Sequence, residues 1–402
     1  MAFRLMESER QTLPYHKPNK LIWKWTYCEG SYGCKIIHGL SLSMDRPPPV
    51  LEAKPVKEKT VKRRKNARPD PALKMLDDIE RMVDAYSRFR NWLNTPPPPP
   101  AAPAPLKKED TAEPFDIQEI PGAMRKLLMP VSATLMERWF AGRLNYSPTG
   151  EDERNGINQT GVPYPPDMID TTTVKLEWVL KYARAKEQFD YLISSAIYSN
   201  AAARVIRNRL LPYKNHYPVV SATDVCGGDI QSIHRHFHVQ FSPVEGTFEQ
   251  KAQQYLKRRT ESNGIPDDLT GALGSFNLYA AIERVEVSLD GTTAAVTHIS
   301  VYVKDNYTFG GEPGESSQYL GHWNARSVNL VPGTLAMSAF GLPWIDYPVA
   351  VGDLRKKDNI LYPVRNRDFR AWQMKHRRGG DFFIYSDRRI VRLQHPIYLN
   401  LS

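Results

Sequence analysis

Two runs of alternating apolar and polar residues flank the dipeptide Asp290-Gly291. They predict two neighbouring strands more strongly than any other feature of the sequence predicts an element of the fold. The runs are IERVEVSL at 282–289 and TTAAVTHISVYVKD at 292–305. A period of two indicates strands with one buried face, and Asp-Gly between such runs is the strongest short-range hairpin signal. We therefore predict an antiparallel β-hairpin over 282–305.

The remainder of the C-terminal part supplies helices first and short strands afterwards. Residues 124–144 and 171–211 show helical spacing of apolar residues, and the second stretch begins with threonines, ends with arginines and has a candidate break near Ser199. Alternation returns at 217–225 and 234–241. These patterns predict an α+β fold, with N-terminal helices followed by a twisted, mostly antiparallel sheet or half barrel.

The N-terminal part is poor in residues that could form a core. Residues 21–43 are apolar and aromatic enough for a short hairpin or a docking segment. The basic run at 62–65 fits a solvated linker, or a nuclear-localisation or phosphate-binding patch, and the five prolines at 96–100 form a stiff spacer. We expect three parts: a short segment at 1–45, a disordered basic and proline-rich tether at 46–114 with one amphipathic helix at 71–93, and an α+β domain at 115–402.

Charge, cysteine content and hydropathy limit the classes of protein. The formal net charge of +10 favours anionic partners such as nucleic acid, lipid headgroups or acidic proteins. Three cysteines fit a reducing cytoplasm better than a disulfide framework. There is no secretory signal and no run of the ~20 apolar residues that a membrane-spanning helix needs. We expect synthesis in the cytoplasm without a signal peptide, and no transmembrane segment.

The end of the second hairpin strand carries the best candidate for catalysis. Continuing the alternation, Asp305, Tyr307 and Phe309 lie on the same side as the core residue Val303. A partly desolvated carboxylate has a raised pKa and suits acid–base work, and a phenol beside it could hold a substrate oxygen. The alternative is that Asp305 merely ends the strand while the two aromatic rings pack.

Two histidine-containing stretches are further candidates. In YLGHWN at 319–324, His322 follows shortly after the turn at Asp305, and if the loop folds back its imidazole could partner Asp305 and Tyr307, so we take it as their assisting group. On a strand, His234, His236 and His238 would share one face. Two of these three could share a metal with Asp229 or Cys226, or all three could form a polar solvent face. We assign no metal ligand, and the sequence leaves cofactors unknown.

The block at 365–389 interleaves arginines with aromatic residues, as nucleic-acid-binding surfaces do. A helix with basic residues outside and aromatic residues inside gives the same pattern. No recognised nucleic-acid-binding module accompanies the charge, so we do not expect nucleic acid to be the partner.

The segments VYVKDNYTF, YLGHWN and RDFRAWQMKHRRGGDFFIYSD resemble a proteobacterial domain of unknown function over roughly residues 115–400. That family is associated with type VI secretion loci and antibacterial effector genes. The resemblance implies delivery of a toxin into a neighbouring cell, with an immunity protein and a secretion spike or chaperone as partners.

A second, partial resemblance is to the catalytic motif of colicin M, which cleaves the lipid-linked peptidoglycan precursor. That motif is Asp-x-Tyr-Asp, five residues, then His-Arg. Asp305 and Tyr307 match its first two positions, whereas Thr308, Gly314 and Glu315 stand at the other three. His322 would have to replace the missing histidine.

Together these features predict an antibacterial effector that acts at the envelope of a target cell, as a hydrolase of peptidoglycan or its precursor, with Asp305, Tyr307 and His322 in the site. The alternatives are a non-enzymatic adaptor or structural interaction protein, carried by the helix at 71–93 and the proline spacer, and a basic nucleic-acid binder.

Overall fold

The computed structural model describes residues 40–50, 113–216, 218–246, 265–310, 317–329, 348–350 and 356–402, together with the backbone of three short N-terminal strands. The chain divides into two compact units, each assembled from separate stretches of sequence. Unit 1 contains residues 1–144, 255–268 and 309–380, and unit 2 contains residues 145–254, 269–308 and 381–402. The helix expected at 71–93, most of the expected tether and a helical stretch expected at 247–260 lie outside the described residues.

Unit 1 combines helices with a five-stranded antiparallel sheet in the order β10-β9-β12-β11-β3. A separate antiparallel pair joins β1 to β2. The elements of this unit are β1 (Tyr15–Pro18), β2 (Trp25–Cys28), β3 (Lys35–Ile36), η3 (Ile117–Glu119), α2 (Ile120–Lys126), α3 (Pro130–Ala141), β9 (Tyr319–Trp323), β10 (Val328–Asn329), β11 (Val349–Ala350), η8 (Lys357–Asn359), β12 (Ile360–Arg365) and α13 (Asn366–His376).

Aromatic side chains of α3 and α13 form the core of unit 1. The Trp139 ring lies edge-on to the rings of Phe309 and Phe369, at centroid distances of 5.0 and 5.6 Å. The rings of Phe309 and Phe369 stack on each other, and Trp372 is fully buried beside them. The helical pattern expected at 124–144 is therefore two helices, because the chain turns at Leu128 with a φ of +61°.

Unit 2 is built on the long hairpin of β7 (Phe276–Val287) and β8 (Thr293–Tyr307), which confirms the hairpin predicted around Asp290-Gly291. Along the outer edge of β8 run first β13 (Phe382–Tyr385) and then β14 (Arg389–Asn400). Along the outer edge of β7 run β6 (His238–Val244) and β5 (Val219–Ser221). Only β4 (Ile169–Asp170) is parallel to its neighbour β13, so the sheet of the described residues is mostly antiparallel.

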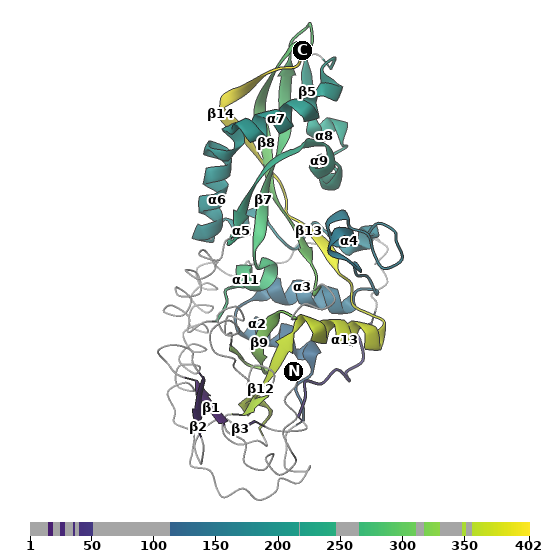
Figure 1. Ribbon diagram of the computed structural model, residues 1–402, viewed down its shortest axis with the longest axis vertical. Coiled ribbons are helices and arrows are strands. Elements are labelled where there is room, and N and C mark those ends of the chain that lie inside the picture. Colours follow the sequence, from purple (N-terminus) through teal and green to yellow (C-terminus); the bar gives the residue numbers. More distant parts are fainter. Residues whose placement is uncertain are drawn as a thin grey trace, which may run out of the picture. The chain divides into compact units, whose positions relative to one another are not determined.

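Helices cover both faces of this curled sheet (Figure 1). Ser242 of β6 bonds Gln188 of α6 with an O–O distance of 2.7 Å, whereas Tyr302 of β8 bonds His234 of α9. Ser242 is paired with Leu278 and Tyr302 with the next residue, Tyr279, so the two helices lie on opposite faces. The helical elements are α4 (Gly150–Asn155), η4 (Pro166–Met168), α5 (Leu176–Val179), α6 (Ala183–Ser194), η5 (Ala196–Tyr198), α7 (Asn200–Leu210), η6 (Leu211–Tyr213), α8 (Ala222–Val225), α9 (Ile230–Phe237) and α11 (Asp268–Leu273).

The helices at 117–213 precede the sheet, and the α+β class is confirmed. The long helical pattern at 171–211 is interrupted more often than expected, but the break near Ser199 is present, where the Ser199 hydroxyl caps α7 by accepting from Ala202 N at 3.2 Å. The strand expected at 217–225 is only the three residues of β5, followed by α8. No helix among the described residues is both long enough and apolar enough to cross a membrane.

Candidate functional site

Strand β8 carries Asp305 and Tyr307 to its end in unit 2. The two residues are two apart on a strand, so their side chains lie on the same face as that of Val303, as the sequence predicts. Asp305 is opposite Ile384 and Tyr307 is opposite Phe382 on β13. The side chains of Asp305 and Tyr307 therefore lie on the face of the sheet that α6 covers, which we call the α6 face. The opposite face, which α9 covers, is called the α9 face.

Burial dominates the electrostatics of Asp305. The side chain is half-buried, and desolvation raises the pKa of its carboxyl to about 8. A hydrogen bond from the backbone N–H of Asn306 and the charge of Lys304 oppose this rise, while the negative charge of Glu153 in α4 adds to it. The carboxyl of Asp305 is therefore mostly protonated at neutral pH and can donate a proton.

Tyr307 is a buried phenol next to this acid. Its ring stacks on Phe382 with centroids 5.1 Å apart and planes 18° from parallel. Burial raises the pKa of the Tyr307 hydroxyl far above its ordinary value, so the phenol stays neutral. A neutral phenol can hold an oxygen by hydrogen bonding but cannot act as a base at neutral pH.

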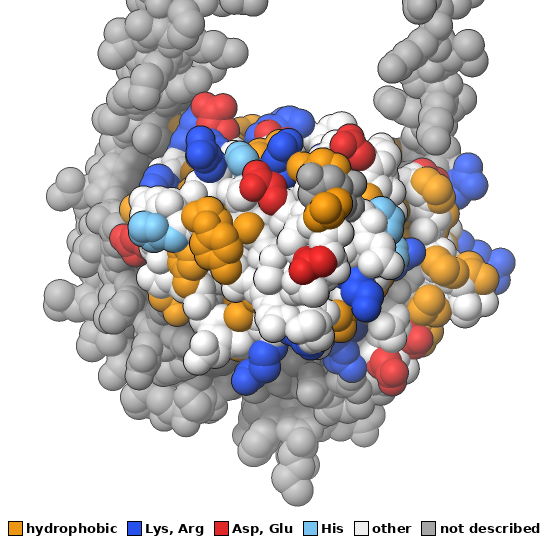
Figure 2. Space-filling model, turned by 90° about the horizontal axis from the view of Figure 1, so that it is seen from above, with side chains coloured by type: hydrophobic (Ala, Val, Ile, Leu, Met, Phe, Trp, Pro, Cys, Tyr) orange, Lys and Arg blue, Asp and Glu red, His pale blue; other side chains and the backbone are white. Residues whose placement is uncertain are grey.

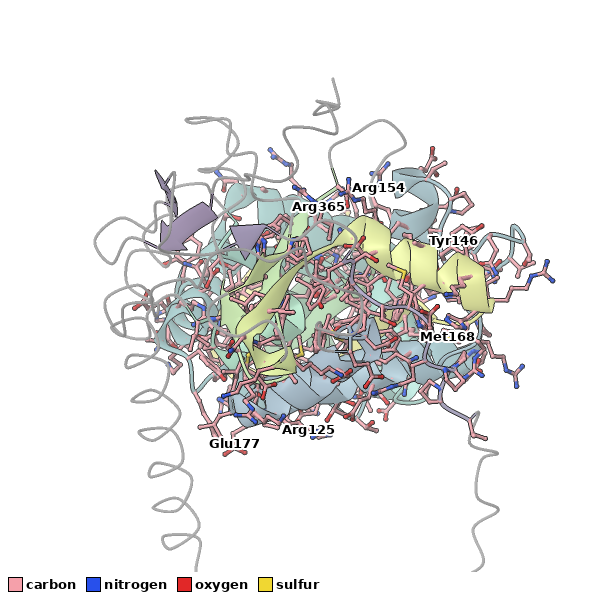
Figure 3. All side chains as sticks on the ribbon, turned by 90° about the horizontal axis from the view of Figure 1, so that it is seen from below. Arg125, Tyr146, Arg154, Met168, Glu177 and Arg365 are labelled. Atoms are coloured by element: carbon pink, nitrogen blue, oxygen red, sulfur yellow. The ribbon has the colours of Figure 1, made fainter. Side chains whose placement is uncertain are left out.

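His322 belongs to unit 1, on β9. It is fully buried, and its Nδ1 hydrogen-bonds the hydroxyl of Tyr319. The guanidinium of Arg365, at the start of α13 (Figure 3), lies over the Tyr319 ring at 5.7 Å. The structure thus brings Asp305 and Tyr307 together on one strand and places His322 in the other unit, within an aromatic and basic environment of its own.

The strand expected for His234, His236 and His238 is wrong for its first half. Residues Ile230–Phe237 form α9, which starts where the Asp229 carboxylate accepts from Ser232 N at 2.9 Å. Only at His238 does the chain become β6. The signal for the helix was in the sequence: an Asp N-cap followed by Ile233 and Phe237, both fully buried, at helical spacing.

The helix α9 carries His234, and β6 begins with His238, so both histidines lie against the α9 face of the sheet. We use the name histidine–tyrosine cluster for five residues that meet there: His234, His238, Tyr279, Tyr302 and Tyr385. His234 Nδ1 lies 2.9 Å from the Tyr302 hydroxyl, and the His234 and His238 rings lie 5.0 Å apart. The Tyr279 ring meets each of the two imidazoles edge-on, at centroid distances of 5.0 Å. The cluster depends on strand register, which single-sequence reasoning did not supply.

The environment keeps the histidines of the cluster neutral. Burial lowers the pKa of His234 to about 3 and that of His238 to about 4. The positive charges of Lys304 and Arg209 contribute to both decreases. Burial also raises the pKa of each of the three tyrosines. At neutral pH the cluster therefore carries no charge of its own, and the positive charges of Lys304 and Arg209 act on its histidines.

His234 and His238 supply the imidazole nitrogens that a metal could use here. Within the described stretches, no group of three or more His, Cys, Asp or Glu residues could hold a metal ion. Two imidazoles fall short of the three or four protein ligands of typical zinc sites.

The basic and aromatic block at 365–389 divides between α13 and β13. Phe369 and Trp372 are fully buried and Tyr385 is nearly so, which leaves these rings unable to stack on bases. The alternative of basic residues outside and aromatic residues inside holds for α13. On the face shown in Figure 2, the described Lys and Arg side chains are interspersed with Asp and Glu.

Comparison with known proteins gives a family without an assigned activity. No curated protein and no solved structure shows significant similarity to the chain. A family of unknown function, DUF6402, matches residues 115–401, which include both Asp305 and the histidine–tyrosine cluster. The chain belongs to this family.

Proposed function

We propose that the protein is an antibacterial effector of the type VI secretion class that acts as a hydrolase at the envelope of the target cell, with Asp305 as its general acid. The observation that supports a hydrolase is the half-buried carboxyl of Asp305, which burial keeps protonated at neutral pH. The effector class rests on the sequence resemblance of the segments around this strand.

Hydrolysis of envelope polymers needs a proton at the leaving oxygen and an activated water. In peptidoglycan and its lipid-linked precursor, the leaving group is a sugar or phosphate oxygen, which a protonated carboxyl at hydrogen-bond distance can protonate as the bond breaks. Asp305 would supply this proton, and the neutral hydroxyl of Tyr307 would orient the substrate oxygen. The negative charge of Glu153 acts on Asp305 and favours its protonated form. In this proposal the carboxylate of Glu153 takes up the proton of the attacking water.

Growth of bacteria that express the protein tests this proposal. Expression directed to the periplasm should stop growth, whereas cytoplasmic expression should be harmless. Asp305→Asn removes the proton donor but keeps the shape of the protonated side chain, so the periplasmic form of this variant should allow growth. The matched control is Asp224→Asn, which changes an exposed carboxylate in α8 of the same unit and should leave toxicity unchanged.

Full toxicity of the Asp305→Asn variant would remove Asp305 from the mechanism. Harmlessness of the wild-type protein in both compartments would remove the toxin proposal and favour an adaptor.

A further inference from the structure

Three polar groups on the α9 face of unit 2 have no hydrogen-bond or ion-pair partner among the described residues. The first is the ammonium group of Lys304, which is half-buried on β8 and lies 5.0 Å from the centre of the Phe383 ring. Among the described residues, no carboxylate lies within ion-pair distance of Lys304. Burial lowers the pKa of this ammonium, which means that the site gives the charge little compensation.

The second group is the side-chain amide of Asn306, two residues further along β8. Both its nitrogen and its oxygen are buried, and neither has a hydrogen-bond partner in the described part of the chain. The third is Nε2 of His238, which is also buried and forms no hydrogen bond with any residue that the structure describes. Each buried polar group left without a partner costs about 1–3 kcal/mol, so native proteins rarely leave several of them together.

Strand register places these groups on one face. Lys304 is opposite Asn277 on β7 and Tyr385 on β13, and Asn306 is opposite Phe383. Even-numbered residues of β8 share the face of Tyr302. This face carries the tyrosines of the histidine–tyrosine cluster and is covered by α9. Asp305 lies on the other face of the same strand.

The charges that act on the two cluster histidines are positive, whereas the carboxylate of Asp229 acts on Tyr385 of the same face. Lys304 and Arg209 both lower the pKa values of the two cluster histidines, and the acid nearest to Lys304 in sequence, Asp305, points to the opposite face. An ammonium group and an amide N–H are donors suited to the oxygens of an anion. Several buried polar groups without hydrogen-bond partners are expected at one place where a protein binds a ligand.

We propose that the α9 face of unit 2 binds an anionic group, a carboxylate or a phosphate, whose oxygens accept hydrogen bonds from Lys304 Nζ and Asn306 Nδ2 beside the Phe383 ring. The inference rests on unpartnered groups and strand register, and it does not require the protein to be a hydrolase. An anion bound there adds a negative charge near the cluster, so it should raise the pKa values of His234 and His238.

Titration of the full chain with inorganic phosphate, and separately with acetate, tests the site at constant ionic strength. The readout is the NMR signals of ¹³C-labelled histidine side chains, assigned with His234→Gln and His238→Gln. At least one of the two anions should give saturable shifts of the cluster signals. Saturation by phosphate alone would identify a phosphate site, and saturation by acetate alone a carboxylate site.

Two matched lysine variants decide which residue holds the anion. Lys304→Met should weaken binding at least tenfold, whereas Lys181→Met, which removes an exposed ammonium of the same unit, should leave it unchanged. Since Lys304 has no ion pair with a described residue and its charge is disfavoured by burial, Lys304→Met should not lower the midpoint of thermal unfolding, which separates a binding role from a structural one. Asp305→Asn should bind the anion normally even if it abolishes toxicity.

The proposal is overturned if neither anion gives saturable shifts with the wild-type protein, or if Lys304→Met binds as tightly as the wild type.

Discussion

At neutral pH, Asp305 holds its proton in the folded protein and has lost it in the unfolded chain, because burial raises its pKa from 3.8 to about 8. The folded state therefore binds more protons than the unfolded state between about pH 4 and pH 8. In this window the free energy of unfolding falls as the pH rises, by no more than about 1.4 kcal/mol per pH unit from this group. The stabilising contribution is complete below pH 4 and is lost at and above pH 8.

Asp305→Asn should remove this pH dependence. The variant is expected to match the wild type near pH 4 and to be more stable than the wild type at pH 9, because the amide never has to be buried as a charge. Urea unfolding at pH values from 4 to 9 measures the difference, with Asp224→Asn as the control that keeps the wild-type slope. Parallel curves for wild type and Asp305→Asn would show that Asp305 titrates normally in the folded state.

Only part of the candidate site follows from local sequence. Strand alternation is enough to put Asp305 and Tyr307 on one face, because it needs no knowledge of neighbouring strands. The role of Lys304 and Asn306 could not be predicted from strand alternation. Whether their side chains find partners depends on which residues of β7, β13 and α9 surround them. The proximity of His322 in sequence gave no information about the unit in which it folds.

At the scale of elements, the turn of the hairpin has a specific requirement at Gly291. This residue has a φ of +66°, and a Cβ added to it would lie 2.7 Å from the backbone oxygen of Lys214. Asp290 completes the turn, because its carboxylate accepts from Ser288 Oγ at 2.6 Å and from Thr292 N at 3.0 Å. Both the backbone conformation and the available space therefore require glycine.

Gly291→Ala should lower the free energy of unfolding by about 1–3 kcal/mol, from the left-handed conformation and the contact with a backbone oxygen that cannot move freely. Gly122→Ala is the matched control of opposite sign, because a Cβ there meets nothing within 4 Å and the residue lies in α2. That variant should gain about 0.5–1 kcal/mol. Chemical denaturation of both variants measures the two effects, and an unchanged Gly291→Ala protein would contradict the requirement.

The element that the sequence analysis misassigned, α9, shows why short segments are difficult. HRHFH alternates with a period of two, yet its helical spacing of Ile233 and Phe237 and its cap at Asp229 decide the structure. The helix passes directly into β6 at His238, without a glycine or proline between them. Two periodicities overlap here, and the choice between them depends on burial against the sheet.

At the scale of the whole molecule, the order of helices and strands was predictable but the division into two units was not. Each unit takes residues from three separate stretches of the chain. Hydrophobic patterns report local periodicity, whereas such an arrangement depends on pairings between residues far apart in sequence, such as β12 with β9 and β13 with β4. The match of the family to residues 115–401 covers unit 2 except for Ser402, but it leaves out residues 1–114 of unit 1.

The described residues 40–50 precede the matched region, but they form hydrogen bonds with the rest of unit 1. The carboxylate of Asp116 accepts from Ser43 Oγ at 2.9 Å and from the backbone nitrogens of Asp45 and Arg46 at 3.1 Å each. The backbone of Ser43 also bonds those of Phe115 and Ile117. From α13, His376 Nε2 lies 2.7 Å from the Met44 oxygen. The buried position of Asp116 makes these bonds stronger than exposed ones.

Asp116→Ala should release residues 40–50 from unit 1, because it removes three acceptor contacts at once and leaves two backbone N–H groups without this partner. A local loss of about 1.4 kcal/mol corresponds to about tenfold faster amide exchange, which hydrogen–deuterium exchange with mass spectrometry can measure on peptides from this segment. Asp45→Ala, which removes only an exposed ion pair to Lys375, should leave the exchange unchanged. Equal exchange in the wild type and Asp116→Ala would show that other contacts, such as that of His376, hold the segment in place.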